Sequence, residues 1–473
     1  MPPTDPTQMT ATELVAQFRT RALSPVEVAT AVLARIGKLD PAVNAFCHLD
    51  PSGALAAAKA SEARWAKGAP QGLLDGVPTT IKDLTAVAGW PTRRGSKLTD
   101  AKAAAFDAPA VARLREHGAV LIGKTTTPEY GWKGVTDSPL AGVTRNPWNT
   151  AHTPGGSSGG AAVAAVLGLG ALHTGTDGAG SVRIPSAFTG CFGLKPTYGR
   201  IPLYPASPMG TLAVLGPMTR TVADAALMMT AMAAPDARDV TADRAAAIDY
   251  RIGLDAGIAG LRISYSPRLG KHVTKVDPEI EAAIGKAVAD LEALGARVTL
   301  ADPELPDDME EVLLTQWSAG SAAIADTYDQ AALAACDPGF FNMIERGRKI
   351  SGADFVRATT RRAAMYEAML RFHEKFDLLV TPTMPLAAIP AGRDVPASGD
   401  WGKEWWEWTP FTYPFNLTQQ PAAACPAGFT RAGLPISLQI VGPLGQDALV
   451  MRAARAFESA RPFRMCDQPR QRP

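Results

Sequence analysis

The sequence predicts an α/β protein, with a central sheet covered by helices on both faces, on the strength of three observations. Apolar strand-like runs alternate with helical patterns in both halves of the chain. Hydrophobic residues make up 46% of the 473 residues and charged residues 20%, a profile typical of globular proteins with a large core. No internal repeat or low-complexity tract interrupts the alternation.

The first half of the chain alternates helices and strands up to residue 233. The run from Ser24 to Glu27 is a capping box with proline at the first helical position, which predicts a helix to about Lys38. Asp107 is predicted to cap a helix that Gly118 ends. The other elements expected here are a helix over 54–67, strands over 76–81 and 119–122, a buried helix of small residues over 161–169 and an amphipathic helix over 221–233.

The second half repeats the alternation after a polar segment, 235–249, which we expect to be a surface connection. Asp277-Pro278 predicts the start of a helix that reaches about Leu294. The strands expected here cover 261–265, 297–300, 378–381 and 438–441.

Charge and cysteine content exclude several function classes. Lys and Arg total 47 against 46 for Asp and Glu, so the net charge of +1 gives no basic field for a nucleic-acid partner. The five cysteines are odd in number and widely spaced, which predicts neither a disulfide framework nor a metal site. No stretch reaches the roughly 18 apolar residues of a membrane span. The first residues also lack a signal-peptide pattern, so we expect a cytoplasmic protein without a membrane partner.

Two short motifs match the patterns of other enzyme classes letter for letter. Gly118–Thr125 fits the phosphate-binding pattern G-x-x-x-x-G-K-[ST], but its middle residues are Ala-Val-Leu-Ile, a strand rather than a loop, so we reject that interpretation. Gly155–Gly159 fits the G-x-S-x-G elbow of α/β-hydrolases, with Ser157 as nucleophile. That elbow follows a strand, whereas residues 144–150 read as a loop. An α/β-hydrolase-type esterase using Ser157 is therefore kept only as an alternative.

Two glycine- and serine-rich segments hold the candidate chemistry. Residues 153–160 read TPGGSSGG, and residues 174–185 read TGTDGAGSVRIP. Three small residues before Ser181 let the backbone approach a ligand closely, and successive N–H groups in such a turn form an anion-binding nest. A tight turn after a buried helix is the purely structural alternative.

In these segments the sequence resembles the amidase signature family, serine hydrolases with a Ser–cis-Ser–Lys triad. The family pattern is GGSSGG followed by TDxGGS[IV]R-P, and both parts occur here in order, with Ser157 and Ser181 standing 24 positions apart. The family's I-K-D stands at Ile81–Asp83. The resemblance covers nearly the whole chain, with further matches at 95–97, 144–149, 190–200, 216–227 and 434–443.

The resemblance implies the amidase signature fold, with a central mixed and twisted β-sheet covered by helices on both faces. It also implies one amidase domain over residues 1–473, with a helical segment over about 1–70, a signature core over about 71–233, and a remainder that completes the sheet and the substrate pocket. The expected assembly is a monomer or a homodimer.

The resemblance implies that Ser181 attacks the carbonyl and that Ser157, on a cis peptide, relays a proton between Ser181 and Lys82. Lysine must be neutral to accept that proton, although its ordinary pKa is about 10.4. Burial lowers a lysine pKa by up to roughly 3–5 units, and Lys82 at a strand end is well placed for burial. Ser158 is expected to support the relay through a hydrogen bond.

The same resemblance implies an oxyanion hole made by the backbone N–H groups of Gly178, Ala179, Gly180 and Ser181. Asp177 and Arg183 flank the nucleophile, and we interpret them as a structural pair that holds the loop. Ala179 stands where the family usually has glycine, which would strain the turn if that residue needs a positive φ.

The implied reaction is hydrolysis of a carboxylic amide C–N bond through a seryl acyl-enzyme, without metal or cofactor. The expected partner is a small-molecule amide, and esters and carbamates are expected to react through the same tetrahedral intermediate. The glutaminase-type subunit of a tRNA-dependent amidotransferase is an alternative within the family. Its usual S-L-D-Q-I-G-P stretch appears here as TLAVLGP over 211–217, which disfavours that alternative.

The segment from Trp401 to Trp408 holds four tryptophans. We hypothesise that it lines or covers a pocket for an apolar or aromatic group, with Trp401 and Trp405 as the candidates. Ordinary core and surface aromatics are the alternative. Tyr130 and Trp132 are further pocket candidates.

Overall fold

A mixed sheet of eleven strands runs through the computed structural model, which describes residues 5–244 and 247–471. In spatial order its strands are β1 (Phe46–Leu49), β3 (Val120–Thr125), β2 (Pro78–Lys82), β6 (Leu172–Asp177), β8 (Val214–Thr219), β7 (Phe192–Lys195), β12 (Ala422–Phe429), β13 (Pro435–Val441), β11 (Leu378–Pro382), β9 (Arg262–Tyr265) and β10 (Arg297–Leu300). Parallel pairing joins β2 to β3 and β6, and β9 to β10 and β11, while the other neighbours are antiparallel. A separate two-stranded sheet joins β4 (Asp137–Ser138) and β5 (Gly142–Val143).

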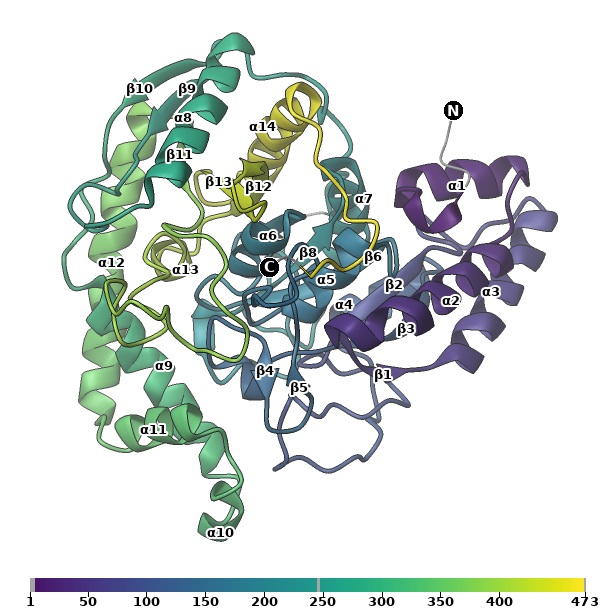
Figure 1. Ribbon diagram of the computed structural model, residues 1–473, viewed down its shortest axis with the longest axis horizontal. Coiled ribbons are helices and arrows are strands. Elements are labelled where there is room, and N and C mark those ends of the chain that lie inside the picture. The colour runs from purple at the N-terminus through teal and green to yellow at the C-terminus, as the bar shows by residue number, and fades with distance from the viewer. Residues whose placement is uncertain (1–4, 245–246, 472–473) are drawn as a thin grey trace.

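Helices flank this sheet, which confirms the predicted α/β fold. The α-helices are α1 (Ala11–Thr20), α2 (Pro25–Val43), α3 (Pro51–Ala66), α4 (Pro109–Glu116), α5 (Gly159–Leu167), α6 (Arg183–Thr189), α7 (Val222–Met232), α8 (Pro278–Ala293), α9 (Met309–Ala325), α10 (Gln330–Leu333), α11 (Pro338–Gly347), α12 (Gly352–Lys375), α13 (Pro414–Leu417) and α14 (Asp447–Ala460). In the described part of the chain, the 3-10 helices are η1 (Pro6–Gln8), η2 (Glu129–Gly131) and η3 (Gly210–Leu212). Figure 1 shows α1–α3 at one end of the molecule and α9–α12 at the other.

Predictions made from local sequence signals are confirmed at several helices and strands. Ser24 caps α2 in the predicted capping box with Glu27, although the helix continues to Val43. Gly118 follows α4 with a φ of +82°, which suits glycine at a helix end. The stretch that spells a phosphate-binding motif contains β3, so its middle residues are strand, as expected.

Two expectations about helices are wrong. Asp107 does not cap α4, because its carboxylate accepts the N–H of Ala88 at 2.8 Å and pairs with Arg115 instead. The helix starts at a proline, whose missing N–H needs no cap. Helix α7 is not amphipathic, since all of its residues except Ala223 and Thr230 are buried. It packs on β8 and is covered by α4 and α14, which leaves it no exposed face.

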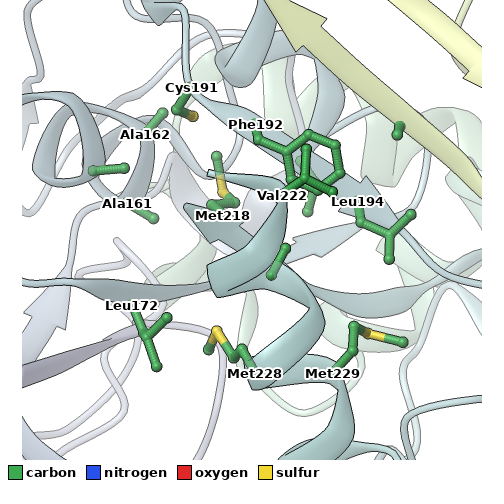
Figure 2. Close-up of a cluster of buried hydrophobic side chains, with 14 of the residues drawn as sticks. Ala161, Ala162, Leu172, Cys191, Phe192, Leu194, Met218, Val222, Met228 and Met229 are labelled. Carbon is green, nitrogen blue, oxygen red and sulfur yellow. The ribbon is translucent and has the colours of Figure 1, made fainter. Parts of the chain in front are cut away.

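The centre of the sheet is fixed by an apolar cluster around α5 and α7. Every residue from Gly159 to Leu167 is buried, which explains why α5 is built from small apolar residues on all sides. Figure 2 shows side chains from α5, β6, β7, β8 and α7 gathered in this cluster, among them Ala161, Leu172 and Met218. Close packing of this kind resists displacement, so the ends of β6 and α5 are rigid supports.

A second apolar cluster, here called the second core, lies on the side of α9, α11 and α12. It draws residues from these helices, from α6 and from the segment between β11 and α13. Ala179 and Ile184 belong to it, so the turn that follows β6 rests on this cluster. The second core therefore supports the residues around Ser181 from behind.

Candidate active site

The two strands that carry the predicted base and the predicted nucleophile turn are parallel neighbours. Lys82 is the last residue of β2, and Asp177 is the last residue of β6. The carboxyl ends of parallel strands meet at one edge of a sheet, so these residues lie at the same edge. The backbone N–H of Lys82 donates to Thr174 Oγ1 at 3.0 Å, which ties the end of β2 to β6.

The side chain of Lys82 is fully buried and has three hydroxyl partners. Its Nζ donates to Ser157 Oγ at 2.7 Å, Ser158 Oγ at 2.8 Å and Thr176 Oγ1 at 2.8 Å. A hydroxyl both donates and accepts, so the same three partners satisfy the charged and the neutral amine. Thr176 was not predicted. Its signal is the period-two spacing from Thr174 on β6, which places both threonines on the face toward Lys82.

Burial controls the protonation of Lys82. It lowers the pKa of the amine well below its usual value, and the negative charge of Asp177 opposes this only in part. A lysine in this environment can act as a base at a pH where a free lysine is protonated.

Ser157 is held in a backbone geometry that excludes larger neighbours. The Gly156–Ser157 peptide bond is cis, as the family resemblance implied. A Cβ on Gly156 would collide with the carbonyl group of Val135. A Cβ on Gly131, which has a φ of +72°, would stand 3.1 Å from Ser157 Oγ. The hydroxyl of Ser157 therefore sits in a pocket shaped by glycines.

The structural context of an α/β-hydrolase elbow is absent. Residues 144–156 form turns, loop and one isolated bridge at His152, with no strand leading into Ser157. Among the described residues, the hydrogen-bond partner of Ser157 Oγ is Lys82 and not a histidine. The esterase alternative with Ser157 as nucleophile is not supported by this arrangement.

Ser181 stands in the turn between β6 and α6. It is 7% exposed and lines the cavity described below. The N–H of Ser158 donates to the carbonyl of Ser181 at 3.1 Å, which ties the two serine-bearing segments together. Within the described residues, Ser181 Oγ has no hydrogen-bond partner, so its hydroxyl is available to a substrate.

Asp177 and Arg183 form a buried ion pair that shapes this turn, with 2.9 Å between Arg183 Nη2 and Asp177 Oδ1. Asp177 Oδ1 also accepts the N–H of Gly180 at 2.7 Å. Asn416 and Gln439 accept hydrogen bonds from Arg183, so the guanidinium is held on three sides. Burial raises the pKa of the Asp177 carboxyl, but the charge and hydrogen bonds of Arg183 outweigh burial and bring it to about 2. Asp177 is thus a fixed anion that organises the turn.

The backbone N–H groups of the turn divide into used and unused donors. The N–H of Gly180 is taken by Asp177, so this predicted member of the oxyanion hole is already occupied. Those of Gly178, Ala179 and Ser181 have no acceptor among the described residues. Gly180, with a φ of +130°, is the residue that needs glycine, whereas Ala179 is not among the residues with positive φ. The alanine therefore fits the turn.

A cavity of about 690 Å³ opens in front of the two serines. This volume lies within the range of roughly 300–1,000 Å³ common for small-molecule sites. Ser157, Thr176 and Ser181 line it together with Tyr130 and Trp317. The remaining wall comes mainly from the segments that follow β2 and precede β8.

The predicted tryptophans are placed differently from the hypothesis. Trp132, Trp401 and Trp405 do not line this cavity. Trp405 is buried in the second core with its ring 5.5 Å from that of Trp317, and the carbonyl of Trp132 accepts the indole N–H of Trp317 at 3.2 Å. Lys275 lies over the Trp401 ring at 4.5 Å. Sequence reasoning missed Trp317, since α9 itself was not predicted.

Tyr130 does line the cavity, as hypothesised. It adopts a left-handed conformation with a φ of +51°, and its hydroxyl is hydrogen-bonded to that of Tyr328. Its ring stacks on Phe340 with 5.6 Å between centroids. These contacts fix the side chain on the cavity wall.

Over residues 5–244 and 247–471, no group of three or more His, Cys, Asp or Glu side chains is arranged to hold a metal ion. In the same residues, no helix is long and apolar enough to cross a membrane.

Comparison with known proteins places this chain among amide-hydrolysing enzymes. A family model described as Amidase matches residues 27–451. An acylamidase of Rhodococcus erythropolis is 40% identical over 460 residues, which is 96% of this chain and 96% of the relative. A glutamyl-tRNA(Gln) amidotransferase subunit of Myxococcus xanthus (strain DK1622) is 38% identical over 495 residues, covering 97% of this chain and 98% of the relative. The crystal structure of a bacterial aryl acylamidase of the amidase signature family superposes with a TM-score of 0.89 at 32% identity, covering 96% of each chain.

Proposed function

The chain belongs to the amidase family and is an amide-hydrolysing enzyme, and from this premise we propose that it acts through a seryl acyl-enzyme on Ser181. The observation that carries the proposal is the buried amine of Lys82, 2.7 Å from Ser157 Oγ at the base of the cavity that Ser181 lines. Activated serine nucleophiles need a base within such reach. We further propose that the whole chain acts as one amidase domain.

In the proposed first step, Ser181 Oγ attacks the amide carbonyl carbon. Its proton passes to Ser157 Oγ while the Ser157 proton passes to neutral Lys82, which becomes an ammonium group. When the tetrahedral intermediate collapses, the C–N bond breaks and the proton returns through Ser157 to the leaving amine. Water then attacks the acyl-enzyme by the same proton path and releases the carboxylic acid and free Ser181.

Negative charge on the intermediate would be stabilised by the unused N–H groups of the turn. Gly178, Ala179 and Ser181 offer these donors without a competing acceptor among the described residues. Losing one such donor typically costs about 3–4 kcal/mol of transition-state stabilisation. This gives the turn a catalytic role beyond holding Ser181.

The cavity supports small amides with an apolar or aromatic group. Trp317 and Tyr130 provide aromatic surface, and Met209, Ile324 and Leu215 provide aliphatic surface. Such walls suit the aryl or alkyl portion of an acylated amine. Esters and carbamates of similar shape would react through the same intermediate.

An amidotransferase subunit remains the second candidate because of the Myxococcus relative. The stretch that usually reads S-L-D-Q-I-G-P in the amidotransferase subunit reads TLAVLGP here, so Ala213 and Val214 replace its Asp and Gln. Ala213, Val214 and Leu215 line the cavity. An apolar wall at this place offers no partner to the charged groups of free glutamine. We therefore favour the stand-alone amidase.

Labelling with a fluorophosphonate, followed by peptide mapping and assay with 4-nitroacetanilide, tests the mechanism. The label is expected on Ser181 and is expected to disappear in Ser181→Ala. Lys82→Met is expected to lower kcat by about 10²–10⁴-fold, the usual contribution of a positioned base. Ser186→Ala is the matched control, a buried serine of α6 outside the cavity wall. A label on Ser157 would instead favour the esterase alternative, and glutamine-dependent activity restored by a copurifying subunit would favour the amidotransferase.

A further inference from the structure

We propose that Arg94 binds a carboxylate carried by the substrate at a distance from its scissile amide. The proposal rests on the proposed amidase function and adds a substrate class to it. Arg94 is a half-buried residue of the cavity wall, in the irregular segment between β2 and α4. Its role depends on where its backbone is anchored and on what its guanidinium does not bind.

The backbone of Arg94 is anchored close to the catalytic residues. Its N–H donates to the carbonyl of Asp83, the residue after Lys82, at 3.1 Å. Its carbonyl accepts the N–H of Tyr130 at 2.8 Å. Gly131, which follows Tyr130, is the glycine whose added Cβ would stand 3.1 Å from Ser157 Oγ. The cation is thus built into the same wall as the serine next to Lys82.

The guanidinium of Arg94 has a stacking partner but no hydrogen-bond acceptor. Its Cζ lies 5.9 Å from the centroid of the Tyr130 ring. The ring supplies no hydrogen-bond acceptor atom, so this contact gives the five N–H donors of the guanidinium no conventional acceptor. Within residues 5–244 and 247–471 the guanidinium makes no hydrogen bond or ion pair.

The acidic groups nearby do not supply the missing acceptor. Asp83 directs its carboxylate to Lys124, with 3.2 Å between Oδ1 and Nζ. Asp100 is exposed on the cavity wall and accepts the N–H of Lys102 at 3.0 Å. The charged side chains of the wall are therefore two cations, Arg94 and Lys102, and one exposed acid.

A carboxylate is the ligand that fits this arrangement. The planar fork of arginine binds both oxygens of a carboxylate at once, and the Arg94 guanidinium lies beside the Tyr130 ring on the cavity wall. The apolar residues that line the same cavity would contact an aryl or alkyl spacer between the carboxylate and the amide. Suitable substrates are acylated aminobenzoates, with the carboxylate on the amine side, and monoanilides of dicarboxylic acids, with the carboxylate on the acyl side.

Two pairs of substrates test this. The first pair is 4-acetamidobenzoate and its neutral isostere 4-nitroacetanilide, and the second is N-phenylsuccinamate and neutral 4-methylpentananilide. In at least one pair, Arg94→Gln is expected to lower kcat/KM for the carboxylate about 10- to 100-fold, the usual effect of losing hydrogen bonds to a charged group. For the neutral member the change is expected to stay within about threefold. Arg94→Lys, which keeps the charge without the fork, is expected to fall between wild type and Arg94→Gln.

Arg93→Gln is the matched control because it removes the same charge one residue away. The Arg93 side chain donates to Thr99 Oγ1 at 3.2 Å and lies outside the cavity wall. Its kcat/KM values are expected to equal those of wild type in both pairs. The proposal about Arg94 would be overturned if Arg94→Gln lost kcat/KM equally on charged and neutral substrates, or if wild type turned over neither carboxylate. As long as the neutral substrates are turned over, the amidase function would stand. Failure of all four substrates together with an unlabelled Ser181 would overturn the amidase mechanism itself.

Discussion

Trp317 of α9 lies directly against Gly178, the first residue of the turn that carries Ser181. A Cβ on residue 178 would come within 2.9 Å of Trp317 Cζ3. Trp405 supports this indole from the second core, and the carbonyl of Trp132 accepts its N–H. The position of an unused backbone donor is therefore set by an aromatic side chain more than a hundred residues away in the sequence.

Gly178→Ala is expected to lower kcat/KM about 100-fold, because the new methyl group forces the turn or the indole to move and misplaces a donor. Steady-state kinetics with 4-nitroacetanilide measure the loss, and a thermal melt checks that the variant is folded. Trp317→Leu in the same chain removes the ring that the methyl group meets. The double variant is expected to recover about tenfold relative to Gly178→Ala, and no recovery would show that the ring does not position the turn.

The value of kcat/KM is expected to rise with pH, following the loss of a single proton. Only the neutral form of Lys82 accepts a proton, and burial lowers the pKa of this amine below its ordinary value of 10.5. The midpoint of kcat/KM against pH should therefore lie below 10.5. A midpoint at or above that value, measured with a substrate whose own ionisation lies outside the range, would contradict the role of Lys82 as base.

The same shift predicts how Lys82 affects stability. Between its depressed pKa in the fold and 10.5, the unfolded chain holds a proton that the folded chain lacks. The free energy of unfolding therefore gains a positive slope with pH in that window from this residue. Urea unfolding of wild type and Lys82→Met at several pH values measures the difference in slope. Lys82→Met should show the flatter dependence, and equal slopes would mean that the amine keeps its ordinary pKa.

Exchanging alanine and glycine is expected to have little effect on activity at position 179 and a large effect at position 180. Ala179→Gly restores the usual family residue at a position without positive φ, so it should cost less than about 1 kcal/mol of stability and leave activity nearly unchanged. Gly180→Ala places a methyl group at a φ of +130° and against the hydroxyl of Thr412. It should lower kcat/KM about 100-fold through a displaced turn. Comparable activities of the two variants would contradict the assignment of Gly180 as the strained position.

Arg183→Met is expected to destabilise the protein by roughly 3–5 kcal/mol, because it leaves the carboxylate of Asp177 buried without its partner. Denaturant unfolding measures this loss. Arg357→Met is the control, since its ion pair with Asp354 is exposed to solvent and its loss is expected to leave the free energy of unfolding nearly unchanged. Similar losses in the two variants would show that the buried pair does not hold the turn.

The strands that could be predicted from the sequence differ in composition from those that could not. The segments 119–122 and 378–381 are short runs of branched apolar residues, and both were found as strands β3 and β11. β6 reads LHTGTD and β12 reads AAACPAGF, which have little β-propensity. These two strands exist because their neighbours in the sheet supply partners on both sides, a tertiary effect that no local pattern records.

The candidate site shows the same division. Lys82, Ser157 and Ser181 could be predicted as site residues because each stands in a short motif of fixed spelling. Thr176 lies within the second motif, but its contact with Lys82 depends on the parallel pairing of β2 and β6. The tryptophan-rich segment was misplaced because composition cannot tell an aromatic that lines a cavity from one that supports it, and Trp405 supports Trp317.

The cavity walls come largely from irregular chain between β2 and α4 and between β7 and β8, whereas Lys82, Ser157 and Ser181 stand on strand ends and buried turns. The side-chain hydrogen bonds of Lys82 go to Ser157, Ser158 and Thr176, which stand outside these two wall segments. Under the proposed mechanism, the residues that break the bond therefore stand on different segments from the surface that selects the substrate. After gene duplication, a copy of such a protein can drift toward new substrates through its walls alone, and directed evolution has the same route open to it.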